Sequence, residues 1–553
     1  MKLRSTIVYA LIALAVVAGV AVAAYRMGSR QSRAEMAALQ DDMDRLVESE
    51  KDAAIVKRVS QQMEDIAYQQ KAISDQQRDR AEEQSILATH NAERAERERI
   101  AAQEAESKAT AAALVAERER ANAERQQEIA QEQRDEATHS RNVADTLNRR
   151  TQAKSLGTTS QVRREAKEPE VADLLAYASW YFLKNNRGNQ YFSETFKALA
   201  LATGGIPRHK VKENGAVNAL SKVPGHPGQC VAVTNYGEVE WLTAVGSDDA
   251  RRISSKPLLF NTAYDFRDVT VVNKKIYALS LKGPLCVLDF TGHMDPVDLP
   301  EDDNYFKLVQ TKGRLLVAGR RSLNWYANGK VSQDVTLDKT LSAIVDRDGT
   351  VCLFFADGSY AEMNAAGGIE EKKPLVQAVV TAAFYDPATE CLLLGTEDGT
   401  VYPLNRYGRV METLSAHKSK CMSITMLNPI VVTGGYDKNV FIWNMENLSF
   451  DSGLSFQEEL EQESVTKRVA NSQEIPAEWL VPVDYSFDGW TLAVCGDDDG
   501  KSVWIGTSAG NVMLLNASAD DMAQQLYGKL KRNLTQQEWT RYVGVSIPYM
   551  KFK

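Results

Sequence analysis

The first third of the 553-residue chain lacks the residues that make turns. No proline precedes Pro169, and no glycine stands between Gly28 and Gly157. Because proline and glycine mark most turns, their absence excludes a compact domain of short strands from this region and favours long helix. After about residue 165 glycine, proline and aromatic residues become frequent, which predicts a second part of a different kind.

The chain is also poor in residues and motifs of metal sites and catalysis. It has neither a G-x-x-x-x-G-K-[ST] phosphate loop nor an H-E-x-x-H motif, and its six histidines include no pair at ligand spacing. A net charge of −9 gives no basic footprint for nucleic acid. We therefore expect no catalytic residue, no cofactor, no metal and no nucleic-acid partner, and we interpret the protein as not an enzyme.

The six cysteines form no C-x-x-C pair, and each lies in or beside an apolar run. This pattern is typical of small buried core residues and argues against a metal site or a disulfide framework. They are Cys230, Cys286, Cys352, Cys391, Cys421 and Cys495.

An unbroken apolar run extends from Ile7 to Tyr25. At about 1.5 Å per residue it is long enough to cross a hydrocarbon core of about 30 Å. A cleaved signal peptide is the alternative, since Ala21–Val22–Ala23 is an acceptable cleavage site, but the run exceeds the usual apolar region of about 7–15 residues. We predict a transmembrane anchor at 1–30. Basic residues on both sides leave its orientation open, with a slight preference for a cytoplasmic amino terminus.

Residues 31–155 are rich in Ala, Glu, Arg and Gln and predict a long helical stalk. Met36, Leu39, Met43 and Leu46 form a heptad seam, which becomes weak after about Ser74. The pattern favours a coiled coil, with a solvated single helix as the alternative; the lack of Pro, Gly and Ser tracts weighs against disorder. A coiled coil here would allow the protein to form a homo-oligomer.

A short helical neck is predicted at 156–208. One helix starts at Glu168–Pro169–Glu170 and ends at Asn185–Asn189, and a second covers Phe192–Leu201. At the other end of the chain, residues 519–553 predict a helical tail, in which Thr535 and Glu538 have the spacing of a capping box.

The stretch Gly434–Trp443 (GGYDKNVFIW) is the most informative in the chain. Together with His417 and Thr433 before it, it resembles a WD repeat, the four-stranded blade of a β-propeller. The resemblance implies a hydrogen-bonded tetrad of His417, Thr433, Asp437 and Trp443. We interpret this tetrad as structural, because such a buried network fixes a turn and the pairing of the strands beside it.

The region 209–518 is long enough for seven blades of about 40–45 residues, and turn signals such as Asp398–Gly399 recur along it. The blades are expected near 212–255, 256–300, 301–339, 340–375, 376–415, 416–476 and 477–518. Only the sixth carries the full tetrad, so six or eight blades stay open as alternatives.

Two features of the last blades have a plain and a functional interpretation. The charged insertion Gln457–Gln473 is a solvated loop or, alternatively, an element that binds a partner. Asp497–Asp498–Asp499 is interpreted as a solvated acidic turn, because lone acidic turns are usually solvated, with a calcium site as the alternative.

The order of these parts is similar to that of bacterial WD-repeat proteins, including those fused to STAND-type NTPases. The matching stretches are Ala130–Arg134, Pro169–Leu183, Asn185–Leu201 and the tail Arg532–Tyr542 (RNLTQQEWTRY). This chain has no NTPase domain, so their switching activity is not implied.

The fold expected is therefore multidomain: a transmembrane helix, a long coiled coil, a small α-helical neck and an all-β seven-bladed propeller, followed by the tail. The function expected is a non-catalytic scaffold in the bacterial inner membrane, anchored by residues 7–25, whose propeller binds other, membrane-associated proteins, with a weak preference for the periplasmic side. One alternative is an accessory subunit of an inner-membrane machine, in which Gly19, Ala21, Ala23 and Ala24 would permit close helix contact. The other is a ligand-binding or catalytic propeller.

Overall fold

The computed structural model describes residues 86–91, 93–94, 97, 113–246, 251–300, 303–364, 367–415, 417–446 and 480–553. The predicted anchor at 7–25, most of the stalk before residue 113 and the insertion 457–473 lie outside these ranges. No helix in the described ranges combines the length and the apolar character that a bilayer crossing requires.

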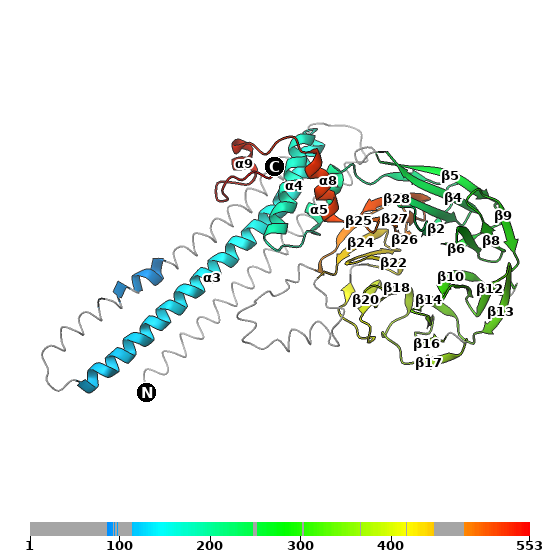
Figure 1. Ribbon diagram of the computed structural model, residues 1–553, viewed down its shortest axis with the longest axis horizontal. Coiled ribbons are helices and arrows are strands. Elements are labelled where there is room, and N and C mark those ends of the chain that lie inside the picture. The colour runs from blue at the N-terminus through cyan, green and yellow to red at the C-terminus, as the bar shows by residue number, and fades with distance from the viewer. Residues whose placement is uncertain are drawn as a thin grey trace. The chain divides into compact units, whose positions relative to one another are not determined.

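Seven antiparallel four-stranded sheets follow one another around a ring (Figure 1). The fold is a seven-bladed, WD40-like β-propeller, so the predicted fold and blade count of the region after the neck are confirmed. The first three blades are β2 (Val217–Lys222), β3 (Gln229–Thr234), β4 (Glu238–Val245) and β5 (Arg252–Phe260); β6 (Phe266–Val272), β7 (Lys275–Ser280), β8 (Leu285–Leu288) and β9 (Met294–Val297); and β10 (Tyr305–Thr311), β11 (Arg314–Gly319), β12 (Ser322–Ala327) and β13 (Lys330–Thr336).

The remaining four blades have the same strand order. They are β14 (Leu341–Arg347), β15 (Thr350–Phe355), β16 (Tyr360–Met363) and β17 (Ile369–Lys372); β18 (Val380–Asp386), β19 (Cys391–Thr396), β20 (Thr400–Leu404) and β21 (Leu414–Ser415); β22 (Cys421–Leu427), β23 (Ile430–Gly435), β24 (Asn439–Asn444) and β25 (Val483–Ser486); and β26 (Thr491–Gly496), β27 (Ser502–Thr507) and β28 (Asn511–Asn516), joined by β1 (Arg208–Lys210).

Strand β1 closes the ring by pairing with β28, with Arg208 opposite Met513 and Lys210 opposite Asn511. The seventh blade thus takes three strands from the end of the propeller sequence and one from its start. The strands also shift two expected blade limits. β5 runs to Phe260, beyond 255, and β25 belongs to the sixth blade although it follows residue 476. Turn signals locate hairpins, but they do not tell which blade an outer strand joins.

The innermost strand of every blade carries the same irregularity. Its pairing with the second strand skips one residue near its start, as in a β-bulge. The shifts lie at Val217/Ala219, Phe266/Asp268, Tyr305/Lys307, Leu341/Ala343, Val380/Ala382, Cys421/Ser423 and Thr491/Ala493. The seven blades are therefore structural repeats, although their sequences share little beyond turn residues.

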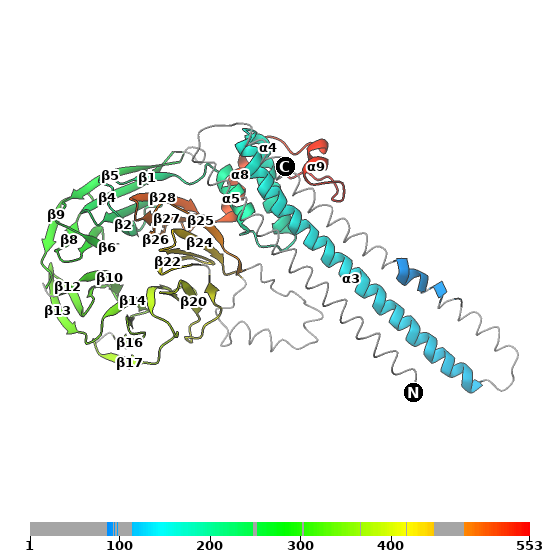
Figure 2. The ribbon, with the colours of Figure 1, turned by 180° about the vertical axis from the view of Figure 1, so that it is seen from behind.

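The helices whose bounds the structure describes precede and follow the propeller in sequence: α3 (Ala113–Glu165), α4 (Pro169–Asn185) and α5 (Ser193–Ala202) before it, and α8 (Ala519–Lys529) and α9 (Gln536–Tyr542) after it (Figures 1 and 2). Proline stands at the start of α4, and Thr535 and Glu538 form both bonds of the capping box at α9. Helix α3 does not end near residue 155 but continues to Glu165, with Gly157 inside it. A Cβ on Gly157 would lie 2.8 Å from the backbone of Glu194, so this glycine lets α5 approach α3.

The neck, the tail and the last two blades share one hydrophobic core. It includes Leu175 and Phe182 of α4, Phe196 of α5, Trp539 of the tail and Ile505 of β27, all nearly inaccessible to solvent. All six cysteines are free, and five of them are buried in the blades, as the sequence pattern predicts. Cys495 differs from the prediction, because it is only half-buried. Burial raises the pKa of Cys391 and of Cys421 to about 12, so these thiols stay protonated.

Candidate interaction surface

The four predicted tetrad residues lie together in the sixth blade. Thr433 is on β23, Trp443 on β24, Asp437 in the turn between them, and His417 in the connection before β22. Nδ1 of His417 lies 3.0 Å from Asp437 Oδ1, and Nε2 lies 2.9 Å from Thr433 Oγ1. Nε1–H of Trp443 donates to the same hydroxyl oxygen at 3.3 Å. The side chains thus form one continuous chain of hydrogen bonds.

Electrostatics define the protonation state of this chain. Burial lowers the pKa of His417, against the opposing effect of Asp437, and so favours a neutral imidazole. Burial raises the pKa of the Asp437 carboxyl, but hydrogen bonds from His417, Lys418 and Asn439 outweigh it and leave that pKa below its usual value. A neutral His417 that donates from Nδ1 to an ionised Asp437, and accepts the Thr433 hydroxyl proton at Nε2, satisfies every partner.

The tetrad holds the turn at Tyr436–Lys438 in place. Asp437 accepts the backbone N–H of Lys418 at 3.0 Å and of Asn439 at 3.1 Å, which ties the turn to the preceding blade connection. Gly435 is required beside it, because a Cβ there would lie 2.6 Å from His417 Nδ1. These contacts hold the turn in one conformation. They offer no open position at which a substrate atom could meet His417, whose side chain is fully enclosed.

Other blades fix the same turn with residues that the tetrad pattern does not identify. Asp303, in the connection before β10, accepts the backbone N–H groups of Arg320 and Arg321 at 2.9 and 2.7 Å and the hydroxyl of Ser322 at 2.8 Å. In the fifth blade the Thr396 hydroxyl donates to Asp398 at 2.6 Å. A lone acidic residue before an inner strand was the available sequence signal, but it is too common to be specific.

Exposed aromatic side chains gather on the face of the ring that the tetrad turn belongs to. Tyr436 stands in that turn and Trp490 in the connection before β26, with ring centroids 4.9 Å apart. They are 37% and 47% exposed, against full burial for most large side chains of the blades. Tyr236, in the corresponding turn of the first blade, and Phe260, at the end of β5, are 54% and 51% exposed. No spacing in the sequence marks these four residues as exposed.

The seventh blade places a turn of small residues between these aromatics. Ser508 accepts the backbone N–H of Trp490 at 2.8 Å, and its own N–H donates to Trp490 O at 2.8 Å. On the other side, Gly510 O accepts the N–H of Val211, in the segment that leads into the first blade. The surface from Tyr436 through Trp490 to Tyr236, here called the aromatic face, therefore spans blades six, seven and one, with the small residues Ser508, Ala509 and Gly510 between Trp490 and the first blade.

This turn of small residues also contains a sequence pattern that carries the catalytic serine in α/β-hydrolases. Gly506–Thr507–Ser508–Ala509–Gly510 has the G-x-S-x-G spacing of a nucleophile elbow, so the expectation that the chain lacks this motif is wrong. That motif acts on a turn from a strand into a helix, whereas here the turn joins strands β27 and β28. The Ser508 hydroxyl is engaged by the backbone of Trp490, and no histidine of the described part of the chain bonds to it.

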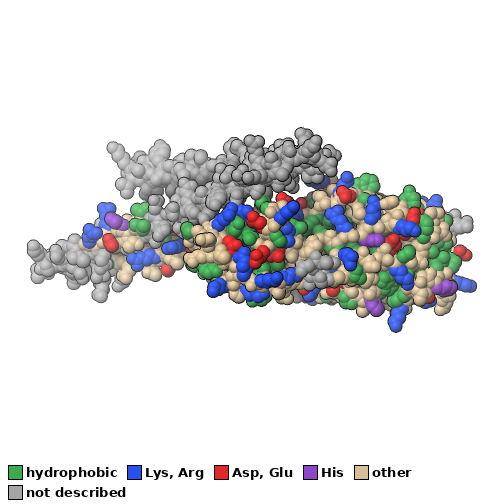
Figure 3. Space-filling model, turned by 90° about the horizontal axis from the view of Figure 1, so that it is seen from above, with side chains coloured by type: hydrophobic (Ala, Val, Ile, Leu, Met, Phe, Trp, Pro, Cys, Tyr) green, Lys and Arg blue, Asp and Glu red, His purple; other side chains and the backbone are tan. Residues whose placement is uncertain are grey.

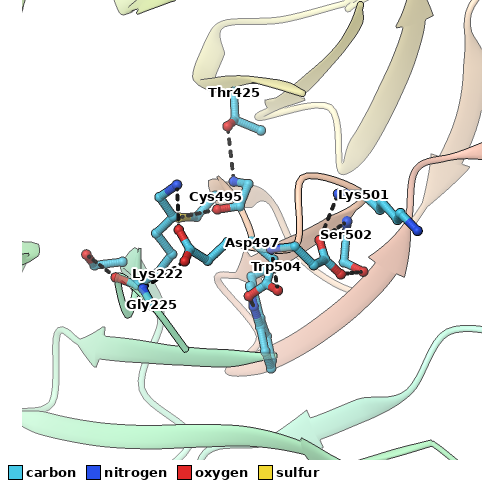
Figure 4. A network of polar contacts seen from close by, with 12 residues as sticks. Lys222, Gly225, Thr425, Cys495, Asp497, Lys501, Ser502 and Trp504 are labelled. Carbon is cyan, nitrogen blue, oxygen red and sulfur yellow. Dashed lines mark hydrogen bonds and ion pairs between the residues drawn. The ribbon is translucent and has the colours of Figure 1, made fainter. Parts of the chain in front are cut away.

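The acidic turn of the seventh blade has protein partners rather than a free carboxylate cluster. Asp497 accepts from Trp504 Nε1 at 2.9 Å and from the N–H of Gly228 at 2.7 Å. Asp499 accepts three bonds from Lys501 and Ser502 (Figure 4). Within the described ranges no group of three or more potential metal ligands occurs.

The middle aspartate of this turn helps to close the ring. Asp498 accepts the N–H of Gly225 at 2.7 Å and pairs with Lys222 Nζ at 3.1 Å, both in the first blade (Figure 4). The bond from Gly225, followed by that from Lys222, holds the pKa of Asp498 below its usual value. The acidic turn thus joins blades seven and one on the side opposite the aromatic face.

Charges of both signs are mixed over the helices and the neighbouring strands (Figure 3). Salt bridges account for part of this pattern, such as Lys184–Asp520 at 2.6 Å and Lys197–Asp484 at 3.0 Å between the neck and its neighbours. No wide field of one sign is visible among the described residues on the face shown in Figure 3.

No protein-family model matches the chain, and no curated protein matches it. Among solved structures, the crystal structure of the WD40 beta propeller domain of Doa1 is similar at 12% identity and a TM-score of 0.44, covering 57% of this chain and 96% of that chain. A chain of the crystal structure of the Mitotic Checkpoint Complex is similar at 14% identity and a TM-score of 0.42, covering 56% of this chain and 90% of that chain. At these values the neighbours say nothing about the partners of this chain.

Proposed function

We propose that this protein is a non-catalytic scaffold, anchored in a membrane through residues 7–25, whose propeller binds other proteins through the aromatic face. The observation that carries the proposal is the contact between Tyr436 and Trp490, two large aromatic side chains that remain more than one-third exposed on turns fixed by the tetrad and by Ser508.

The exposed aromatic rings of this surface favour binding on energetic grounds. Leaving a tyrosine and a tryptophan in water forgoes the stabilisation that their burial would give, about 1.5–3 kcal/mol for a large apolar side chain. Rigid aromatic side chains lose little conformational entropy when a partner covers them, and they are enriched among residues that dominate binding energy. A face that presents Tyr436 and Trp490 on fixed turns, with Tyr236 and Phe260 exposed beside the first blade, suits a protein partner.

The anchoring part of the proposal is supported by sequence alone. The apolar run Ile7–Tyr25 has the length of a membrane span, and the Ala- and Glu-rich residues that follow would separate it from the propeller. If stalks pair as a coiled coil, two or more propellers would be held near one another, which raises their effective concentration for a shared partner.

Affinity purification of the full-length protein from native membranes tests the proposal. Trp490→Ala and Tyr436→Ala, singly and together, are expected to release partners that the wild-type protein retains. Tyr407→Ala is the matched control, because Tyr407 is 56% exposed but lies in the connection between β20 and β21, away from the aromatic face. All three substitutions are at exposed positions, so thermal unfolding should be nearly unchanged.

The comparison of the variants decides the outcome. A partner lost with the Trp490 variant and kept with the Tyr407 variant supports binding through the aromatic face. Equal retention of every partner by all variants would contradict it.

A further inference from the structure

A cleft of about 180 Å³ lies on the opposite side of the last two blades from the aromatic face. Its walls come from the end of α4, the loop before α5, the β22–β23 and β26–β27 turns, the end of β24 and the start of α8. Four separate parts of the sequence therefore meet around one space. The volume is in the range of a small molecule with a few hydrogen-bonding groups rather than of a single water.

Two polar side chains reach this cleft although they are almost buried. Asn444 is 6% exposed; its Oδ1 accepts the N–H of Glu446 at 3.0 Å, and its Nδ2 has no partner in the described part of the chain. Tyr191 is 8% exposed; its oxygen accepts the N–H of Ala519 at 3.5 Å, and no described residue accepts its hydroxyl proton. Both residues line the cleft, so the Asn444 amide and the Tyr191 hydroxyl are available to donate hydrogen bonds to a bound molecule.

Charged groups of both signs line the same space. Lys184 pairs with Asp520 at 2.6 Å, and Lys501 pairs with Asp521 at 2.5 Å. An ammonium group has three N–H donors, so each lysine keeps donors beyond its ion pair. Glu446 also lines the cleft; it is exposed and forms no ion pair with any residue in the described ranges.

We propose that this cleft binds a small zwitterion, a molecule with a carboxylate and an ammonium group such as a free α-amino acid or a dipeptide. The ligand carboxylate accepts from Asn444 Nδ2 and from the ammonium groups of Lys184 and Lys501. The ligand ammonium group pairs with Glu446. Leu427, Pro429 and Ile430 give the cleft an apolar wall for the rest of the ligand. The site is separate from the aromatic face and does not depend on it.

The chemistry of the lining favours this ligand over simpler ions. A plain anion would be repelled by Glu446, which forms no ion pair with a described residue, and a plain cation would leave the donors of Asn444 and Tyr191 unused. A ligand with both charges satisfies both sets of groups. Because its walls belong to the neck, α8 and two blades, a bound ligand would also connect these parts.

Calorimetric titration and thermal unfolding of the full-length protein in mild detergent test the site, with each standard L-amino acid and with glycylglycine as probes. At least one probe is expected to bind and to raise the melting temperature. Binding of an amino acid in preference to the dipeptide indicates a free small ligand; the reverse indicates the end of a peptide.

Two variants locate the binding. Glu446→Gln removes an exposed charge, and Asn444→Asp keeps the acceptor for the Glu446 N–H while removing the Nδ2 donor. Each substitution is expected to lower the affinity for the probe at least about tenfold. Glu397→Gln, an exposed carboxylate of the fifth blade, and Trp490→Ala are expected to bind as the wild type does. Binding unaffected by Glu446→Gln, or no binding of any probe to the wild type, overturns the proposal and leaves the aromatic face untouched.

Discussion

At the scale of single residues, the turn at Tyr436–Lys438 joins buried chemistry to an exposed surface. His417, Thr433 and Trp443 are buried, and their hydrogen bonds lead to Asp437. The preceding residue, Tyr436, is exposed to solvent and contacts Trp490. A network that fixes the turn therefore also fixes the position of an aromatic side chain that is available for binding.

The neutral state of His417 predicts a pH dependence of stability. Its pKa in the folded protein is lowered, so below the unfolded value of about 6.5 the unfolded chain binds a proton that the folded one does not. The contribution of the neutral His417 to the free energy of unfolding is therefore present above about pH 6.5 and is lost as the pH falls below that value. Urea unfolding at about pH 7.5 and about pH 5.5, on either side of that value, should show a lower midpoint in the more acidic buffer for the wild type.

His417→Gln should remove that part of the pH dependence and cost about 1–3 kcal/mol at neutral pH, because Thr433 and Asp437 lose a buried partner. His293→Gln serves as the control, since His293 is mostly exposed and its loss should change neither quantity. A His417→Gln variant whose midpoint falls with pH as steeply as that of the wild type would contradict a neutral His417.

At this scale the residues that follow a known motif spacing could be predicted from the sequence, and the functional residues outside such a motif could not. His417, Thr433, Asp437 and Trp443 match the WD repeat and lie in one hydrogen-bonded chain. Asp303 performs a similar task from another position, and Asn444 becomes notable only because the cleft around it leaves its donor without a partner in the described ranges. Contacts between distant residues carry these roles, and a single sequence does not encode which residues meet.

At the scale of elements, small residues in second strands explain how the blades pack side by side. A Cβ on Gly395 would lie 2.6 Å from Cys421 Sγ, and one on Gly434 would lie 2.4 Å from Thr491. In each case the first residue of the next inner strand lies over the glycine, beside the repeated bulge. The rhythm of hairpin turns was enough to predict seven blades. The reach of β5 and β25 was not predictable, because pairing at an outer edge depends on the rest of the ring.

The glycines of the helices allow a matched test of packing. Gly157→Ala improves helix propensity by about 0.5–1 kcal/mol. The new Cβ, however, meets the backbone of Glu194 and Thr195 within 2.9 Å. Because a backbone cannot move aside cheaply, we expect a net loss of about 1–3 kcal/mol from overpacking.

Gly528→Ala in α8 is the control, since its Cβ would meet nothing within 4 Å. This substitution should stabilise the protein by about 0.5–1 kcal/mol. Chemical unfolding of both variants measures whether each substitution raises or lowers the free energy of unfolding. If both are stabilising, α3 and α5 are not packed as closely as the structure has them.

At the scale of the whole molecule, the tail belongs to the same folded unit as the neck. Phe552 lies with its ring centroid 4.9 Å from that of Tyr181 on α4, and Asn533 binds the backbone of Phe552 and Lys553. Trp180 of α4 donates to Asp520 of α8 at 3.0 Å. Sequence patterns predicted neck and tail as separate helical segments, because helix signals are local and the contacts that unite them span most of the chain.

Two deletions distinguish a removable anchor from an integral tail. Removing residues 1–30 is expected to transfer the protein from the membrane to the soluble fraction and to leave the propeller folded, because the strands of all seven sheets lie between Arg208 and Asn516. Removing residues 519–553 is expected to abolish cooperative unfolding of the neck and blades six and seven, because Met522, Leu526 and Trp539 fill their shared core. Carbonate extraction and limited proteolysis measure the two effects. If the chain without residues 519–553 resists protease as well as the full chain does, the shared core is refuted. If the protein without residues 1–30 stays in the membrane, the anchor is refuted.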